Sequence, residues 1–264
     1  MCGIAGYSLV ASSPLERTLA AQALLAGIAE RGADAVGYAH RTPGERVSVH
    51  KQRSGASALL DEITVPQSAT EILVHVRDYT KGHPTVAANN HPIRHGAVIG
   101  IHNGVILNDD ELLADHECAR REPGMTVDSE AIFALAAHSR NEPRALEALA
   151  GSMAAAWLDQ REPGTLFAAH GVGRPLWLGR GRDEVFFASN RAALEIAAEY
   201  TGVRLRVSEV RDGTFLALRG GRVARTARFR PDRSYVEETA LPAVRAPGES
   251  AHCLERLAAI AATG

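Results

Sequence analysis

Short apolar segments of strand length recur along almost the whole of this 264-residue chain, and segments with helical periodicity interrupt them. The predicted strands lie at 2–10, 38–39, 47–50, 72–77, 97–101, 153–158, 166–169, 176–178, 185–188, 215–218 and 223–224. The predicted helices lie at 13–32, 108–113, 126–135, 192–200 and 250–262, with a further one through 146–149. Strands followed by helices and then by strands again favour an α+β fold in which two packed sheets lie between outer helices.

Local signals predict where some of these elements begin and end. Ser13, Pro14 and Glu16 predict a helix start, with Ser13 as the N-cap, Pro14 in the first position and Glu16 completing a capping box. Gly32 predicts the end of that helix. Residues 219–222, with two central glycines, predict the turn of a β-hairpin.

Charge and cysteine content exclude several classes of protein. Lysine and arginine total 29 against 31 acidic residues, a formal charge of −2, so we expect neither nucleic acid nor an anionic membrane as a partner. The three cysteines, Cys2, Cys118 and Cys253, have no paired spacing. They argue against a disulfide framework, favour a reducing cytoplasm and form no metal-binding motif. The chain shows neither a signal-peptide pattern nor an apolar stretch of about 18 residues, so no membrane span is expected.

The C-terminal part differs in composition from the rest of the chain. Pro242 and Pro247 predict a linker, and 250–262 predicts a small amphipathic helix. We therefore divide the chain into a main domain at 1–235 and a linker with a C-terminal helix at 236–264. That helix is a candidate docking element for a partner, and packing back on its own domain is an equally good interpretation.

Cys2 is the second encoded residue, and its small side chain should allow removal of Met1 during synthesis. Removal would leave a thiol and a free α-amino group on the same residue. A thiolate is the reactive form of cysteine, and an α-amino group titrates at about 7.7–8.0, so one residue can carry both the nucleophile and its general base. The alternative is a small buried hydrophobe at the start of a strand.

Asn103 and Gly104 follow the strand predicted at 97–101. Asn103 offers side-chain N–H donors, and Gly104 offers a backbone N–H that a substrate can approach closely. Two convergent donors suit a tetrahedral oxyanion, and the loss of one such donor costs about 2.7–4 kcal/mol. In isolation Asn-Gly is first a turn dipeptide, although here it lies between two apolar runs without an obvious hairpin register.

Three further polar residues are candidates for substrate binding, and each has a purely structural alternative. Arg77 ends a predicted buried strand and could clamp a carboxylate or form a surface salt bridge. Asp128 could hold an ammonium group, or be favoured in a first helical turn by the helix dipole alone. His91 could act as an acid or base, although a hydrogen-bonded loop histidine is the commoner case.

The order of these signals along the chain resembles that of a known family. Six motifs carry the resemblance: CGIAG at 2–6, RGADAVG at 31–37, HVR at 75–77 with Thr80 and Gly82, NNHP at 89–92, IHNGVI at 101–106 and DSE at 128–130. Each motif is short, but together they occur in the order and at the spacing of the class II, N-terminal nucleophile glutamine amidotransferases. Over about residues 2–230, the chain is most similar to the amidotransferase half of glucosamine-6-phosphate synthase.

The resemblance implies the four-layer αββα fold of the N-terminal nucleophile hydrolases, with two mostly antiparallel sheets. It also implies hydrolysis of the side-chain amide of L-glutamine to glutamate without a cofactor, and transfer of the ammonia to an acceptor. Cys2 would attack the amide carbon to form a γ-glutamyl thioester, with its α-amine carrying the proton. Asn103 and the Gly104 N–H would bind the oxyanion.

The resemblance implies roles in substrate binding as well. Arg77 and Asp128 would bind the α-carboxylate and α-ammonium groups of glutamine, with Thr80 assisting from the loop. Arg31 matches a family position near the N-terminal cysteine, and His91 belongs to a matched motif, so we count both with the substrate site.

Two departures from the family pattern bear on function. Asp78 stands where the nearest family members carry a tryptophan that is associated with closing the glutamine site and gating ammonia. No synthase segment follows the amidotransferase part, so we expect a separate synthase protein as the partner that receives ammonia. The alternatives are another N-terminal-cysteine amide hydrolase, acting on a γ-glutamyl or acyl-amine substrate, and a non-catalytic glutamine-binding regulatory module.

Overall fold

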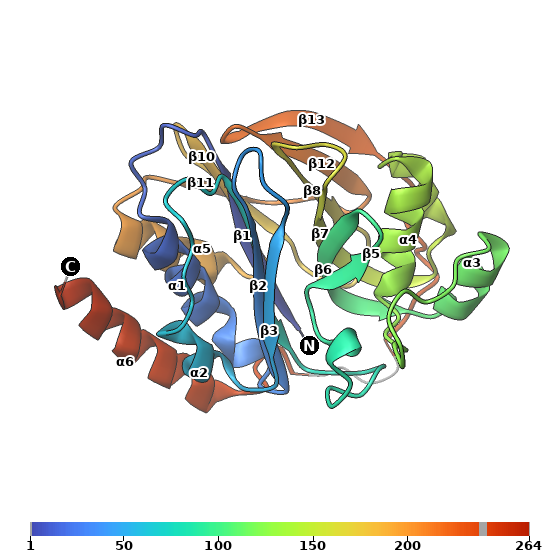
Figure 1. Ribbon diagram of the computed structural model, residues 1–264, viewed down its shortest axis with the longest axis horizontal. Coiled ribbons are helices and arrows are strands. Elements are labelled where there is room, and N and C mark those ends of the chain that lie inside the picture. Colours follow the sequence, from blue (N-terminus) through green and yellow to red (C-terminus); the bar gives the residue numbers. More distant parts are fainter. Residues whose placement is uncertain (1, 238–241, 264) are drawn as a thin grey trace.

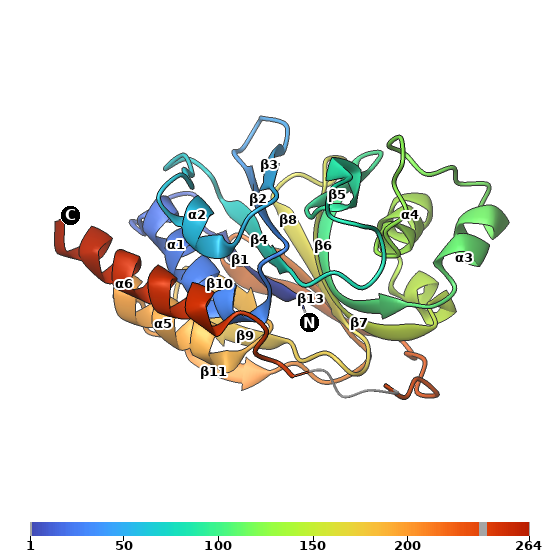
Figure 2. The same ribbon diagram turned by 90° about the horizontal axis from the view of Figure 1, so that it is seen from below.

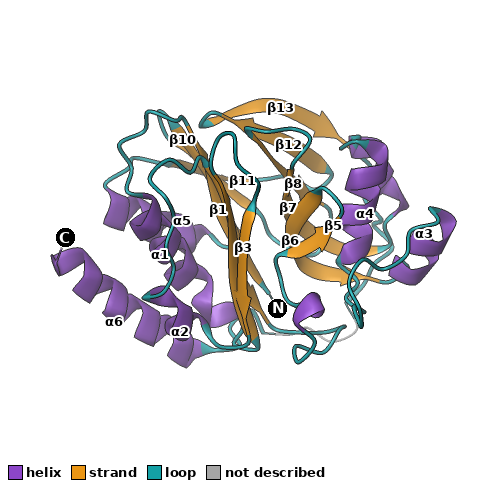
Figure 3. Cartoon of the chain, viewed as in Figure 1, coloured by secondary structure: helices purple, strands orange, loops and turns teal. Residues whose placement is uncertain are grey.

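The computed structural model describes residues 2–237 and 242–263, and these form four layers (Figure 1). Two sheets lie face to face in the middle, and helices cover the outer face of each sheet (Figure 3). Fully buried side chains such as Ile4, Leu73, Ile101 and Phe187 fill the space between the sheets. The α+β arrangement of two packed sheets between helices is therefore confirmed.

The first sheet has seven strands in the order β11-β9-β10-β1-β4-β2-β3. They are β1 (Gly3–Leu9), β2 (Ala35–Arg41), β3 (Ser48–Gln52), β4 (Glu71–Arg77), β9 (Trp177–Arg180), β10 (Glu184–Ala188) and β11 (Arg206–Glu209). β1 and β4 are antiparallel neighbours, with Gly3 opposite Val76. This register brings Cys2, just before β1, to the end of β4 at Arg77.

The second sheet has six strands in the order β13-β12-β8-β7-β6-β5. They are β5 (Ile93–His95), β6 (Val98–Ile106), β7 (Gly151–Asp159), β8 (Thr165–His170), β12 (Thr214–Arg219) and β13 (Arg222–Arg228). Asn103 and Gly104 lie within β6, opposite Ala154 and Met153 of β7, so the turn interpretation of Asn-Gly is wrong. The hairpin predicted at 219–222 is confirmed between β12 and β13.

Helices on the first sheet are α1 (Arg17–Ile28), α2 (Ala56–Leu60), α5 (Arg191–Thr201) and α6 (Pro247–Thr263), and those on the second are α3 (Asp109–Asp115) and α4 (Glu130–Ser139). Short 3₁₀ helices are η1 (Ala29–Arg31), η2 (Ala87–Asn89) and η3 (Pro143–Ala148). None of the helices within the described ranges is both long and apolar enough to cross a membrane.

Two predicted helix starts and one predicted helix type are wrong. α1 begins at Arg17 and not near Ser13, because the carboxylate of Glu16 is the N-cap and accepts the N–H groups of Thr18 (3.1 Å) and Leu19. Pro247 begins α6 and does not belong to a linker, since proline suits the first position of a helix. The helix predicted through 146–149 is the 3₁₀ helix η3.

The C-terminal helix α6 packs along α1 and α2 (Figure 2). Its Cys253 and Leu257 are fully buried in the cluster beneath the helix layer of the first sheet. The carboxylate of Glu249 accepts the N–H of Ser57 at 2.8 Å, which is an additional tie to α2. One face of α6 therefore belongs to the fold of its own chain.

Candidate active site

Cys2 lies immediately before β1, the central strand of the first sheet. Its thiol is partly buried and donates to the carbonyl oxygen of Asp78 at 3.4 Å, and its own carbonyl oxygen accepts from Nε of Arg31 at 3.0 Å. Gly3 has to be glycine, because a Cβ there would lie 2.8 Å from Val76 and 2.9 Å from Ile28. Burial raises the pKa of the Cys2 thiol above its ordinary value, with partial compensation from its hydrogen bond and the charge of Arg77. The thiol therefore needs a base to become a thiolate near neutral pH.

Asn103 and Gly104 come to the same place from the second sheet. Asn103 is fully buried, and neither its amide nitrogen nor its amide oxygen has a hydrogen-bond partner among the described residues. Gly104 has a φ of 150°, and a Cβ there would lie 2.0 Å from the carbonyl oxygen of Ser152. An unpartnered buried amide is costly, so its retention calls for an explanation.

Two small cavities meet at Cys2. The first, which we call the head-group cavity, is lined by Cys2, Arg77, Tyr79, Thr80, Lys81, His91, His102, Gly104, Val127, Asp128 and Ser129. The second, which we call the exit cavity, is lined by Cys2, Asp78, Thr80, Asn103, Gly104, Val105, Arg174 and Glu237. The residues predicted from the sequence thus converge on the thiol from both sheets. Arg31 alone among them lines neither cavity and instead binds the backbone of Cys2.

Arg77 is the last residue of β4 and is almost completely buried. Its Nη1 donates to the side-chain oxygen of Asn90 at 2.5 Å, and its Nη2 donates to the carbonyl oxygens of Lys81 (3.0 Å) and Gly82. The guanidinium therefore holds its own loop in place, and the alternative of a surface salt bridge is wrong.

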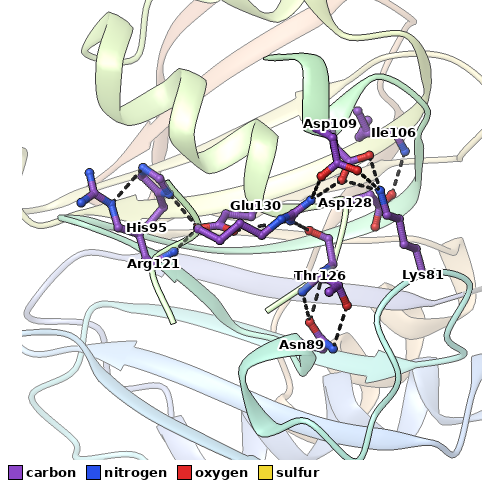
Figure 4. Close-up of polar contacts among 12 residues, drawn as sticks. Lys81, Asn89, His95, Ile106, Asp109, Arg121, Thr126, Asp128 and Glu130 are labelled. Atoms are coloured by element: carbon purple, nitrogen blue, oxygen red, sulfur yellow. Dashed lines mark hydrogen bonds and ion pairs between the residues drawn. The ribbon is translucent and has the colours of Figure 1, made fainter. Parts of the chain in front are cut away.

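Asp128 lies just before α4 (Figure 4) and is one of the residues that line the head-group cavity. Its Oδ2 accepts the N–H of Ile106 at 2.7 Å. Burial raises the pKa of this carboxyl to about 6, with the charge of Asp109 acting in the same direction. Asp128 is therefore a buried carboxylate above about pH 6.

A charge network that sequence reasoning missed supports the head-group cavity. Asp109 is buried, and its two oxygens bind Nζ of Lys81 and Nη2 of Arg120, each at 2.7 Å (Figure 4). The acidic pair at 109–110, shortly after the IHNGVI motif, was the available signal, but nothing local indicates that Lys81 would meet it.

Three buried histidines, His75, His91 and His102, gather at the head-group cavity, which His91 and His102 line. The rings of His75 and His91 stack with centroids 4.2 Å apart, and Nε2 of His75 lies 3.1 Å from the carbonyl oxygen of His102. Burial lowers the pKa of His91 well below its ordinary value and those of His75 and His102 to about 3, so all three are neutral near pH 7. Neither ring nitrogen of His91 has a partner among the described residues, so the hydrogen-bonded loop interpretation of His91 is wrong.

Comparison with known proteins gives consistent results. The glutamine amidotransferase domain family matches residues 75–196. The glutamine–fructose-6-phosphate aminotransferase of Caulobacter vibrioides is 31% identical over 259 residues, covering 90% of this chain and 40% of that protein. The enzyme of the same name from Chlamydia trachomatis is 30% identical over 242 residues, covering 87% and 37%. The chain thus spans about two fifths of the length of these relatives.

A solved structure shares the fold. The glutamine phosphoribosylpyrophosphate amidotransferase of B. subtilis superposes with a TM-score of 0.67 at 19% sequence identity, over 86% of this chain and 49% of that one.

Proposed function

This chain carries a glutamine amidotransferase domain of the class II, N-terminal nucleophile family, and we propose that it hydrolyses the side-chain amide of L-glutamine through Cys2. The observation that carries the proposal is the meeting of a thiol with an unpartnered buried amide. Cys2 and Asn103 come from different sheets and line the same cavity, together with a glycine whose backbone a substrate can approach. Such an arrangement suits nucleophilic attack on a carbonyl and binding of the resulting oxyanion.

The proposed first half-reaction forms a thioester. Met1 lies outside the described residues, and its removal would free the α-amine of Cys2. That amine takes the thiol proton, and the thiolate attacks the amide carbon. The oxygen becomes an oxyanion held by the Asn103 side chain and the Gly104 N–H. The C–N bond then breaks, the α-ammonium gives its proton to the leaving nitrogen, and ammonia departs from a γ-glutamyl thioester.

In the second half-reaction water attacks the thioester carbon, and the α-amine accepts a proton from that water. The C–S bond breaks, Cys2 regains its thiol, and glutamate leaves. Each step needs only groups of this chain, water and the substrate.

We propose that the head-group cavity binds the end of glutamine that carries the α-carboxylate and α-ammonium groups. Arg77 would bind the α-carboxylate and Asp128 the α-ammonium, with Thr80 and His91 completing the walls. Arg31 would fix the backbone of the nucleophile. Because burial raises the pKa of Asp128 to about 6, this mode of binding needs a pH above that value.

We further propose that the ammonia passes to a synthase on a separate polypeptide in the cytoplasm. The relatives named above are amino- and amidotransferases, which supports transfer of nitrogen and not simple release. The segment 236–264 would contact that synthase through the exposed side of α6. Co-purification of a synthase whose presence raises glutamine turnover would support this part, whereas full solitary turnover with no co-purifying synthase would contradict it.

The core of the proposal is tested by a substrate panel. L-glutamine should yield glutamate and ammonia in equal amounts, and N-acyl amines without an amino-acid head group should react far more slowly. Faster turnover of acyl amines than of glutamine would favour a different N-terminal-cysteine amide hydrolase. Binding of glutamine without any turnover would favour a regulatory module.

A further inference from the structure

Part of the wall of the exit cavity is an ion pair between residues far apart in the sequence. Arg174 follows β8, is almost completely buried and lines the cavity together with Cys2. Its Nη1 and Nη2 donate to the two carboxylate oxygens of Glu237 at 3.0 and 2.6 Å. A bidentate arginine–carboxylate pair of this kind is among the stronger polar contacts in proteins.

Glu237 is held in place by the segment that leads to it. After β13, the chain returns across the end of β7, where the carboxylate of Asp232 accepts the N–H of Gly151 at 3.3 Å. The ring of Tyr235 then lies close to Gly173, the residue before Arg174, where an added Cβ would be 3.8 Å from the ring. The hydrogen bonds from Arg174, with a further contribution from its charge, lower the pKa of Glu237, so this carboxylate stays ionised at neutral pH. This wall of the exit cavity is therefore tied to the start of β7 and to Arg174 by hydrogen bonds.

Under the proposed function, the head-group cavity holds the amino-acid end of the substrate, so the Arg174–Glu237 wall lies on the other side of the acyl group. With the amino-acid head group in the head-group cavity, the acyl carbon on Cys2 faces the exit cavity, which also contains Asn103 and Gly104. A nucleophile that resolves the thioester then approaches from that side. The exit cavity has a volume of about 30 Å³, which is room for about one water molecule, so an amine larger than water would have to displace the Arg174–Glu237 pair that lines it.

We propose that Arg174 and Glu237 are specificity-determining residues that limit which nucleophiles reach the acyl group on Cys2. The inference rests on the proposed function for its role in catalysis, but the access it describes can be measured without turnover. When an amine enters, its nitrogen bonds to the thioester carbon, the C–S bond breaks and Sγ of Cys2 accepts the proton that the nitrogen gives up.

The first test measures access to Cys2 with thiol reagents of different size. Iodoacetamide and N-(1-pyrenyl)maleimide are applied to the full chain, and modification of the N-terminal peptide is followed by mass spectrometry. Glu237→Ala should raise the rate with the maleimide relative to iodoacetamide by about tenfold, because opening no longer requires breaking a charge-assisted pair. If the alanine variant does not fold, Glu237→Gln keeps the side-chain volume, and a smaller rise is expected.

A matched control is available in η3, where Glu147 contacts the start of the same returning segment. Glu147 accepts the N–H of Arg230 at 3.0 Å, and its side chain is 27% exposed against 28% for Glu237. Glu147→Ala should therefore loosen the start of the returning segment without changing the ratio of the two labelling rates. An equal ratio in the Glu147 and Glu237 variants would overturn the inference.

The second test measures the chemistry. With glutamine and either hydroxylamine or O-benzylhydroxylamine, Glu237→Ala should increase the yield of the benzylated hydroxamate relative to the unsubstituted one. A changed labelling ratio without any turnover would support the role of Arg174 and Glu237 in limiting access and would contradict the proposed function. Full turnover with unchanged ratios in both tests would contradict the wall and leave the proposed function standing.

Discussion

The charged groups of the head-group cavity and the amide of Asn103 in the exit cavity differ in how they are satisfied, although the ring nitrogens of His91 on the head-group side also lack a partner among the described residues. On the head-group side, Arg77 is bonded to Asn90 and Lys81 to Asp109, so the charges are already held in position by the protein. On the exit side, the amide of Asn103 is buried without a partner among the described residues. A satisfied network rigidifies a site, whereas an unsatisfied amide costs stability unless a ligand uses it. The charges of the head-group cavity are therefore preformed for binding, whereas the exit cavity provides an amide that is free for the reacting oxygen.

The largest expected effect is at the nucleophile itself. Cys2→Ala should lower glutamine hydrolysis by about 10⁴-fold or more, as expected for loss of a nucleophile. Cys118→Ala is a matched control, because that thiol is also partly buried and donates to a carbonyl oxygen at 3.4 Å. Comparable loss of activity in the two variants would show that general damage, and not the nucleophile, explains the result.

The next largest effect tests the unsatisfied amide. Asn103→Ala should lower kcat by about 10²–10³-fold with little change in KM, because its amide is assigned to the oxyanion alone. Stability should hold or rise, since no hydrogen bond is lost.

Asn141 is the contrasting control, because it is also buried but bonds Trp157 and Asp159 at 2.8 and 2.9 Å. Asn141→Ala should lower the free energy of unfolding by about 1–3 kcal/mol without a specific loss of kcat. Denaturant unfolding and steady-state kinetics on both variants check the pair of results.

The buried carboxylate of Asp128 should lower the free energy of unfolding while it strengthens the binding of glutamine. Its pKa is raised from 3.8 to about 6 in the folded protein, so between these values the folded state binds more protons and stability falls as pH rises. At pH 7.5, Asp128→Asn should therefore increase the free energy of unfolding, by up to about 3 kcal/mol. The same variant should raise KM for glutamine by about 10–100-fold, as expected for loss of a charged hydrogen bond.

The pH dependence of KM provides the second readout for Asp128. In the unmodified protein KM should rise as pH falls below about 6, because the carboxylate becomes neutral. The Asn variant should lack this rise. A wild-type KM that stays flat from pH 5 to 8 would contradict the assigned role.

The smallest effect is expected at Lys81, which lines the head-group cavity but is 38% exposed. Lys81→Met should raise KM only a fewfold, or about 0.5–1 kcal/mol, because Arg120 still pairs with Asp109 and exposed pairs contribute little. An effect on KM larger than that of Asp128→Asn would reverse the proposed order within the head-group cavity.

The sequence predicts the parts of the site that are built from adjacent residues, and it does not predict contacts between residues far apart in the chain. Motifs of adjacent residues, such as the IHNGVI run of β6, carry enough local pattern to indicate both a strand and its chemistry. The Arg174–Glu237 pair joins residues 63 positions apart, and only the folded chain brings them together. Short elements such as α2 and β11 were missed because five or four residues give too little periodicity. The N-cap predicted at Ser13 is wrong because both Ser13 and Glu16 can cap a helix, and in the structure the carboxylate of Glu16 caps α1.

The most direct test of the central claim is the intact mass of active protein, measured alone and after a rapid acid quench in the presence of glutamine. The proposed function predicts a chain that lacks Met1 and gains a γ-glutamyl group on Cys2 during turnover. Fully active protein that retains Met1, or turnover without an adduct on Cys2 even when breakdown of the intermediate is slowed, would contradict it.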